Sequence, residues 1–340
     1  MAERLSLFFV IFVPAKKITI TEMNIKLFAS LSLWALALTG MAQEKVVPVK
    51  YGDMNQWVTR RIYESGIIGG HTKLLYELGP TQEIDGNVAY VNQGGSQWAN
   101  SNVMAKVMGI VKTNTSVYPE KRENHGYCAR LETHIEKVKV LGMINITVLA
   151  SGSLYLGDMK EPITGTKDGE KALNMGVPFT SRPKAVRYDY KVKMSGEPNR
   201  IRQTGFSRKE TIEGQDCSIM TCLLQKRTED AEGNIIAKRV GTIVVKYAKS
   251  ESWKNGATYE IMYGDISHDS RYVPELMELG VGKYHARNSK GESVMIKENG
   301  WAGKDEQPTH LILQFTSSLG GAFVGSPGNT LWVDNVNLVY

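Results

Sequence analysis

The amino-acid sequence predicts an all-β protein, an antiparallel two-sheet β-sandwich with long loops between its strands. Many short segments alternate apolar and polar side chains with a period of two. Gly-, Pro- and Asn-rich turns separate these segments, and the sequence contains no heptad pattern, internal repeat or sustained helical periodicity. This combination is typical of two packed antiparallel sheets.

The clearest strand lies at residues 186–194. Its side chains alternate strictly between an apolar set (Val186, Tyr188, Tyr190, Val192, Met194) and a polar set (Arg187, Asp189, Lys191, Lys193). Strict alternation over nine residues indicates an antiparallel strand with one buried face and one face in water.

The N-terminal region contains the pattern of a secretory signal peptide. Residues 23–43 read MNIKLFASLSLWALALTGMAQ, in which Lys26 precedes an apolar run at residues 27–38. Small residues stand at the −3 and −1 positions of a cleavage before Gln43, which completes the three-part layout. The apolar run is short for a transmembrane helix, so we expect no transmembrane segment after cleavage.

These features define the expected mature chain. We expect residues 1–22 to come from an upstream start codon, with a genuine two-part leader as the alternative, and residues 23–42 to be the signal peptide. The β-sandwich domain is then 43–340, and a boundary near 116–126 is the alternative to a single domain. A protein of this kind is secreted, to the periplasm or the cell surface.

The charge and the cysteines exclude some partners and leave others open. The first 42 residues carry four basic and two acidic residues, so the net charge falls from +6 to +4 after cleavage. Mild charge of mixed sign argues against a nucleic acid partner. Cys128, Cys217 and Cys222 form no metal-binding spacing. They could be buried free thiols, or Cys128 could form a disulfide with one of the other two.

The first third of the chain predicts short strands and polar connections. Strands are expected at residues 43–51, 57–63 and 73–78. Residues 93–102 predict a polar loop, 103–111 a strand or a short helix, and 114–126 a turn-rich connection.

The rest of the chain predicts further strands. They are expected at residues 127–135, 137–141, 144–156 with a bend at 151–153, 217–227, 235–247 and 258–262. Within 309–340 two strands are expected, at 311–316 and 331–339, with Gly/Ser-rich and Ser-Pro-Gly-Asn turns between them. Residues 158–176 predict a long loop. A short helix is expected at 272–279, because Pro274 suits a helix start and Gly280 a helix end.

Four segments carry a resemblance to a known family. They are GYCARLET at 126–133, ASGSLYLGDM at 150–159, GVPFTSRPKAVRYDYKVKMSG at 176–196, and the ending TLWVDNVNLVY at 330–340. As a set, within 126–340, they resemble the putative carbohydrate metabolism domain family, and the ending is similar to carbohydrate-binding jelly-roll modules. The resemblance implies a jelly-roll form of the sandwich and a role in glycan capture or processing.

Motifs of several enzyme classes are missing from the sequence. It contains no HExxH, GxSxG, P-loop or GxGxxG motif, and its six histidines have no metal-ligand spacing. A glycoside hydrolase would need two carboxylates about 5–10 Å apart across a cleft. Glu132, Asp189, Glu260 and Asp265 are candidates for such a pair.

Sugar binding requires aromatic rings and polar groups near them. Trp98 lies with Asn102 in the polar stretch GGSQWANSN, where we expect an exposed loop. Trp253 and Trp301 also lie in polar stretches, whereas Trp57 and Trp332 lie in strand patterns and are expected in the core.

A second group of candidates lies on polar strand faces. Arg187, Asp189 and Lys191 could line a polar groove together with Arg130 and Glu132. Cross-strand charge pairing is the simpler interpretation of these five residues.

Asp334 is a candidate ligand of a structural calcium ion, and we expect no other cofactor. The resemblance to jelly-roll modules implies such a site, in which the aspartate of the last strand meets carbonyl groups near the first. Calcium takes six to eight oxygen ligands, and Asp53 or Glu64 could contribute. The alternative is that Asp334 accepts hydrogen bonds from a turn.

Three functions remain open from the sequence. The first is a secreted β-sandwich protein that binds a glycan and serves carbohydrate metabolism. The second is a glycoside hydrolase that uses paired carboxylates on a concave sheet face. The third is a structural or adhesion protein of the cell surface.

Overall fold

The structure is a computed structural model that describes residues 44–140, 144–165, 169–205, 208–282, 284–321 and 323–340. The expected upstream start at 1–22 and the expected signal peptide at 23–42 lie outside the described residues. Within the described part, no helix has the length and apolar character needed to span a membrane.

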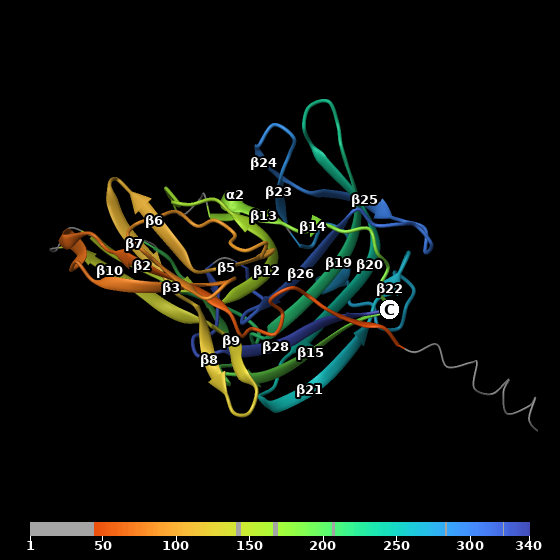
Figure 1. Ribbon diagram of the computed structural model, residues 1–340, viewed down its shortest axis with the longest axis horizontal. Helices are drawn as coiled ribbons and strands as arrows, with labels where there is room; N and C mark the ends of the chain where they lie inside the picture. Colours follow the sequence, from red (N-terminus) through yellow and green to blue (C-terminus); the bar gives the residue numbers. More distant parts are fainter. Residues whose placement is uncertain (1–43, 141–143, 166–168, 206–207, 283, 322) are drawn as a thin grey trace, which may run out of the picture. The chain divides into compact units, whose positions relative to one another are not determined.

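Two large sheets organise the described chain (Figure 1). Six strands form the first sheet, in the order β21 (Glu251–Glu260), β15 (Ala185–Lys193), β28 (Thr330–Val339), β9 (Gly126–Glu132) and β8 (Val117–Arg122), with β1 (Val46–Pro48) on β28. All of its pairs are antiparallel. We call it the six-stranded sheet.

The second sheet has nine strands in the described part. Its main order is β13 (Leu173–Met175), β12 (Ser153–Met159), β26 (His310–Thr316), β19 (Ser218–Glu229), β20 (Ile235–Tyr247) and β22 (Met262–Tyr263), with β5 (Trp98–Asn100), β14 (Val177–Pro178) and β25 (Lys297–Trp301) attached. Only β25 pairs in parallel, with β20, among the described strands of this sheet.

Smaller sheets and single-turn helices complete the described part. Three small sheets have three strands each: β2 (Trp57–Tyr63) with β3 (Thr72–Leu78) and β4 (Gln82–Asp85); β10 (His134–Val140) with β11 (Ile144–Ala150) and β17 (Thr204–Gly205); and β16 (Arg200–Arg202) with β18 (Glu210–Ile212) and β27 (Val324–Gly325). Two are hairpins of two strands: β6 (Val103–Val107) with β7 (Ile110–Asn114), and β23 (His285–Arg287) with β24 (Ser293–Met295). The helical turns are η1 (Gly66–Ile68), α2 (Gly169–Ala172) and α3 (Pro274–Met277).

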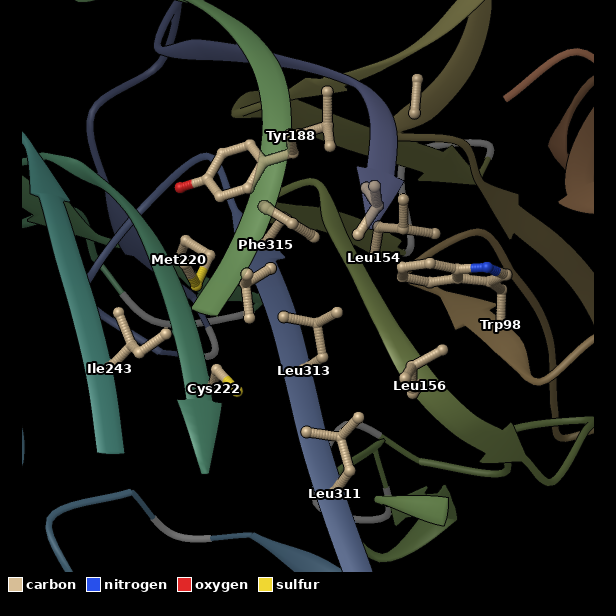
Figure 2. Packing of buried hydrophobic residues seen from close by; sticks show 14 of the residues in the cluster. Trp98, Leu154, Leu156, Tyr188, Met220, Cys222, Ile243, Leu311, Leu313 and Phe315 are labelled. Carbon is tan, nitrogen blue, oxygen red and sulfur yellow. The ribbon is translucent and has the colours of Figure 1, made fainter. Parts of the chain in front are cut away.

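The core lies between the two large sheets. The apolar face of β15 packs against β26 and β19 in one cluster of buried side chains (Figure 2). Tyr188 of β15 meets Phe315 of β26 edge-on, with ring centroids 5.0 Å apart, and Met220 and Cys222 of β19 belong to the same cluster. The prediction of an all-β two-sheet sandwich is therefore confirmed, while its jelly-roll type stays a prediction.

Several sequence predictions of local structure are confirmed. Strand β15 has the predicted alternation, since Val186, Tyr188, Tyr190 and Val192 are buried in the core. The bend expected at 151–153 separates β11 from β12, and these two strands join different sheets. The three cysteines are free and buried, and burial raises the pKa of the Cys128 thiol to about 12.

Two further segments were predicted less definitely. Residues 103–111, predicted as a strand or a short helix, form strands, the β6–β7 hairpin, which turns at Met108 and Gly109. Both have positive φ, as a tight two-residue hairpin turn requires. Residues 114–126 contain strand β8 and not only turns; Pro119 is tolerated there because β8 is an edge strand.

Candidate functional site

The polar face of the six-stranded sheet points away from the sandwich core, and it brings together most of the predicted polar candidates. In β15, Asp189 and Lys191 alternate with the core residues Tyr188, Tyr190 and Val192. The same alternation places Trp332 and Asp334 of β28 opposite to the core residues of that strand. We call this surface the outer face.

Aromatic and cationic side chains follow one another across the outer face. Strand register places Lys191 beside Trp332, Trp332 beside Arg130, and Arg130 beside Tyr118. Lys191 Nζ lies 3.8 Å from the ring centroid of Trp332, and the Arg130 guanidinium lies 4.5 Å from that of Tyr118. At the other end, Trp253 of β21 has its ring centroid 5.7 Å from Lys191 Nζ.

These five residues, Trp253, Lys191, Trp332, Arg130 and Tyr118, are called the aromatic–cation row. Cation–π contacts of this kind contribute roughly 0.5–1 kcal/mol each at exposed sites. Trp332 is 9% exposed, whereas the other four are half-buried. The row therefore offers the half-exposed rings of Trp253 and Tyr118 beside the charged groups of Lys191 and Arg130, while Trp332 is largely covered.

Two glutamates accompany the row. Glu120 of β8 accepts a hydrogen bond from the indole N–H of Trp332 at 2.8 Å and lies 3.2 Å from Arg130. Glu132 of β9 lies 3.3 Å from the Arg130 guanidinium. Arg130 thus forms a cross-strand ion pair with Glu120 and a second ion pair with Glu132 of its own strand, on a surface where Arg130 and Glu132 remain about one-third exposed.

Arg122 of β8 connects several strands of the six-stranded sheet through its guanidinium group. Its guanidinium Nη1 lies 2.8 Å from Asp189 of β15 and 2.5 Å from Asp334 of β28. Its Nη2 donates to Asn255 of β21 at 2.7 Å. The guanidinium also lies 3.9 Å from the ring centroid of Trp253, so one buried side chain links four strands and supports the ring.

The two carboxylates around Arg122 differ in their electrostatics. Burial opposes ionisation of Asp189, but hydrogen bonds from Asn335 and the Gly256 N–H, together with Arg122, place its pKa below the usual range. Burial raises the pKa of Asp334 to about 6, and Arg122 offsets this only in part. One guanidinium therefore serves two carboxylates, of which Asp334 is the more readily protonated.

The surroundings of Asp334 do not fit the predicted calcium site. A calcium ion needs a shell of oxygen ligands, but the Asp334 carboxylate contacts the Arg122 guanidinium and the Asn335 N–H. Of the proposed co-ligands, Glu64 is engaged by Lys112 and Thr113. In the described residues, no three His, Cys, Asp or Glu side chains are grouped as metal ligands.

The expectation that Trp98 and Asn102 lie in an exposed loop is wrong. Trp98 belongs to β5, which pairs with β12, and it is 1% exposed with its indole N–H donating to Lys50 O at 2.9 Å. Asn102 is fully buried, and its side-chain amide donates hydrogen bonds to the backbone carbonyl oxygens of Tyr76 and Val117. Both side chains hold the fold together and present no surface to a sugar.

The structure also adds site residues that sequence reasoning placed elsewhere. Trp253 was expected in a polar loop but lies in strand β21 on the outer face. Trp332 lies in a strand and is buried, as expected, but it lies on the outer face and not in the core between the two sheets. Tyr118 and Arg122 fall in the segment that we expected to be turns. The signal that could have found them is the alternation of Tyr118, Glu120 and Arg122 in β8.

Arg187 lies on β15 with its Nε donating to Thr258 at 2.8 Å, and it does not join the row.

Comparisons with known proteins concern the region that contains the row. A family model described as "Putative carbohydrate metabolism domain" matches residues 81–339, which include all five residues of the row. No curated protein matches the chain.

Two solved structures are similar to the chain at low identity. One is described as a putative glycoside hydrolase from Bacteroides thetaiotaomicron VPI-5482, with 18% identity and a TM-score of 0.38 over 67% of this chain. This chain spans 58% of the length of that structure. The other is described as "CBM4 structure and function", with 11% identity and a TM-score of 0.19, over 59% of this chain and 81% of that one.

Proposed function

The chain belongs to the putative carbohydrate metabolism domain family, and we propose that it is a secreted protein that binds a glycan on the outer face of the six-stranded sheet. Family membership supports a function related to carbohydrate. The signal-peptide pattern at 23–42 supports export to the periplasm or the cell surface. The aromatic–cation row supports the outer face as the site of contact.

The observation that carries the proposal is the position of Trp253. Its indole is half-buried, and the Arg122 guanidinium, which lies 3.9 Å from the ring centroid, has a side chain only 4% exposed. The ring is therefore supported from the sheet side, and its remaining surface is free to contact a ligand. A flat, fixed aromatic ring suits the apolar face of a pyranose and costs little conformational entropy on binding.

Polar groups beside the ring suit sugar hydroxyls. Lys191 can donate hydrogen bonds, Glu132 can accept them, and Arg130 can donate them in a fixed planar geometry. In the described part, neither Lys191 nor Lys193 forms an ion pair with an acidic side chain, and the Lys191 ammonium lies between the rings of Trp332 and Trp253. Both lysines border an open hollow of about 350 Å³ that also includes Glu251 and Trp332.

The glycoside hydrolase alternative is less well supported on this face. Asp189 and Asp334 are engaged by Arg122, and Glu120 and Glu132 by Arg130. The candidate pair of Glu132 and Asp189 lies on strands separated by β28, with Asp189 opposite Asp334 and Glu132 opposite Thr330. Two strand intervals and four residues along the strand separate them by roughly 16 Å, more than a glycoside hydrolase pair requires. Asp189 is also buried beneath the row, where a glycosidic oxygen could not reach it.

The adhesion alternative would use the edge strand β21, and features of that strand oppose it. Open edge strands pair with other chains unless they are blunted. The pairing of β21 with β15 has two register shifts, and Lys254 and Gly256, which has a positive φ, lie within β21. Such features typically protect an edge from strand addition.

The test is binding of the full chain to a broad glycan array, with Trp253→Ala beside it. We expect the variant to lose tenfold or more in affinity, which corresponds to about 1.4 kcal/mol. The control is Trp301→Ala, because Trp301 is also half-buried in a strand but lies on β25 of the other sheet. Unchanged binding by Trp253→Ala, or equal loss in both variants, would contradict the site. No binding to any glycan would favour a protein partner instead.

A further inference from the structure

The aromatic–cation row continues beyond the six-stranded sheet. Tyr118 on the edge strand β8 contacts Tyr76 of β3, with ring centroids 6.2 Å apart and planes tilted by 52°. Tyr76 is half-buried, like Tyr118. Side chains suited to sugars therefore follow one another from β21, through β15, β28, β9 and β8, to β3.

The direction of the row sets its length. The row crosses the strands and does not follow one of them, since each member lies on the next strand in the sheet order. Four intervals separate β21 from β8, which is roughly 19 Å at about 4.8 Å per interval. The row is therefore several times longer than one sugar ring.

The composition of the row also repeats along its length. Trp253 and Trp332 flank Lys191, and Trp332 and Tyr118 flank Arg130. The half-exposed rings of Trp253 and Tyr118 can contact the apolar faces of sugar units, while the neighbouring cations donate hydrogen bonds to hydroxyls. Trp332, which is only 9% exposed, positions Lys191 between them. A repeated arrangement of this kind matches a repeated ligand.

The surface is open to solvent at two places along the row. The hollow beside Lys191 and Trp332 opens to solvent, and Arg130 and Glu132 remain about one-third exposed further along. Recognition of a chain end requires an enclosing wall, whereas the interior of a chain needs an open path on both sides.

We propose that the row binds an extended, unbranched stretch of a polysaccharide chain laid across the strands, with Trp253 at one end and Tyr118 with Tyr76 at the other. The inference rests on the proposed glycan-binding function and specifies its ligand class. The bound stretch has about four sugar units, one for each strand interval. The protein thus contacts the interior of a chain and not its terminus.

The experiment measures affinity against chain length. The full chain is titrated with cello-, xylo-, manno- and malto-oligosaccharides and oligogalacturonides of two to eight units. For the series that binds, the dissociation constant should fall with each added unit up to about four, and then level off. An affinity that is independent of length, with Trp253→Ala still abolishing binding, would overturn the extended ligand and leave the proposed function intact.

Variants at the far end of the row distinguish a binding role from a structural one. Tyr118→Ala should weaken binding of six-unit chains severalfold and reduce the ratio of long-chain to short-chain affinity. Tyr118→Phe keeps the ring and should keep the length dependence. Tyr127→Ala is the matched control, since Tyr127 is an exposed tyrosine on β9 outside the row.

The remaining outcomes are decisive as well. If Tyr118→Ala does not fold, Tyr118→Leu preserves much of the volume without the ring and should give the same loss. A length dependence that survives removal of the ring would place the chain elsewhere and overturn the inference. If no oligosaccharide and no glycan on the array binds, both this inference and the proposed function fail.

Discussion

Two buried arginines in this protein each hold two carboxylates, and they do so in different surroundings. Arg60 of β2 contacts Glu77 of β3 at 3.1 Å and forms a second ion pair with Glu161. Arg122 of β8 contacts Asp189 and Asp334. The two arginine side chains are 3% and 4% exposed.

The partners around the Arg60 cluster are internal. Glu161 accepts hydrogen bonds from the N–H groups of Tyr90 and Met104, and Glu77 accepts one from the amide of Asn100. Burial raises the pKa of Glu77 well above its usual range. This cluster joins β2 and β3 to β5 and the end of β12, and it presents nothing to solvent.

The partners around the Arg122 cluster include an edge strand. Trp253, Asn255 and Gly256 all lie in β21, and each contacts Arg122 or Asp189. The cluster therefore fixes an exposed part of the sheet. A buried ionic cluster is therefore not by itself evidence of a binding site. Arg122 differs from Arg60 because it supports a half-exposed ring, that of Trp253.

Removal of each arginine should give the largest effect and separate the two roles. Breaking a buried ion pair leaves uncompensated carboxylates, so Arg60→Met should lower the free energy of unfolding by about 4 kcal/mol. Arg122→Met should cost less, because its cluster lies beside the half-exposed Trp253 on the outer face, where water can replace the guanidinium more easily. Urea unfolding measures both.

Glycan binding supplies the second readout for these variants. Measured where both proteins are folded, affinity should fall in Arg122→Met, because Trp253 loses its support, and stay unchanged in Arg60→Met. Equal affinities in the two variants would mean that Arg122, like Arg60, only stabilises the fold.

A tryptophan lies next to each cluster. Replacing Trp98, beside the Arg60 cluster, should mainly lower stability, whereas replacing Trp253, beside the Arg122 cluster, should mainly lower glycan affinity. Trp98 lies in β5 with Asn100 of the Arg60 cluster and is buried. Trp98→Ala should therefore lower the free energy of unfolding by about 3 kcal/mol or more. Trp253→Ala should cost about 1 kcal/mol or less, because the ring is half-exposed on an edge strand.

Thermal or urea unfolding, together with binding, checks this pair. Trp98→Ala that remains folded should bind glycan as the unmodified chain does. A large loss of stability in Trp253→Ala would show that its ring is a packing residue, and the contrast between the clusters would disappear.

The sequence predicted the part of the site that depends on local alternation. Asp189 and Lys191 were placed on the polar face because strand periodicity is visible within nine residues. Arg130 and Glu132 were placed beside them for the same reason, and the structure brings Arg130 next to Trp332 and Lys191 through register.

What the sequence could not show depends on long-range pairing. The turn-forming residues around Trp98 indicated an exposed loop, but β5 is buried because it pairs with β12, more than 50 residues away in the chain. The link between Arg122 and Asp334 joins residues 212 positions apart. No local pattern encodes such a contact, so the sequence offered Asp334 only as a candidate calcium ligand, from the resemblance to jelly-roll modules, or as an acceptor of hydrogen bonds from a turn.

The last effect concerns the pH dependence of stability, and it tests whether Asp334 is the less well compensated carboxylate of the Arg122 cluster. Its pKa is about 6 in the folded protein and lies near 3.9 when unfolded. The folded state therefore binds the proton more tightly, so this group's contribution is fully present below pH 4 and is lost as the pH rises through 6. Over that window the loss is about 2 kcal/mol.

Asp334→Asn should remove this slope between pH 4 and 6, since Asp189, whose pKa lies below its usual range, does not titrate there. Asp269→Asn is the control: Asp269 is paired with Arg271, its pKa is lowered to about 2, and its removal should leave the slope intact. Urea unfolding at pH 4, 5, 6 and 7 measures all three proteins. An unchanged slope in Asp334→Asn would mean that Arg122 compensates both carboxylates fully, as two separate ion pairs would, and that the cluster holds β21 without electrostatic strain.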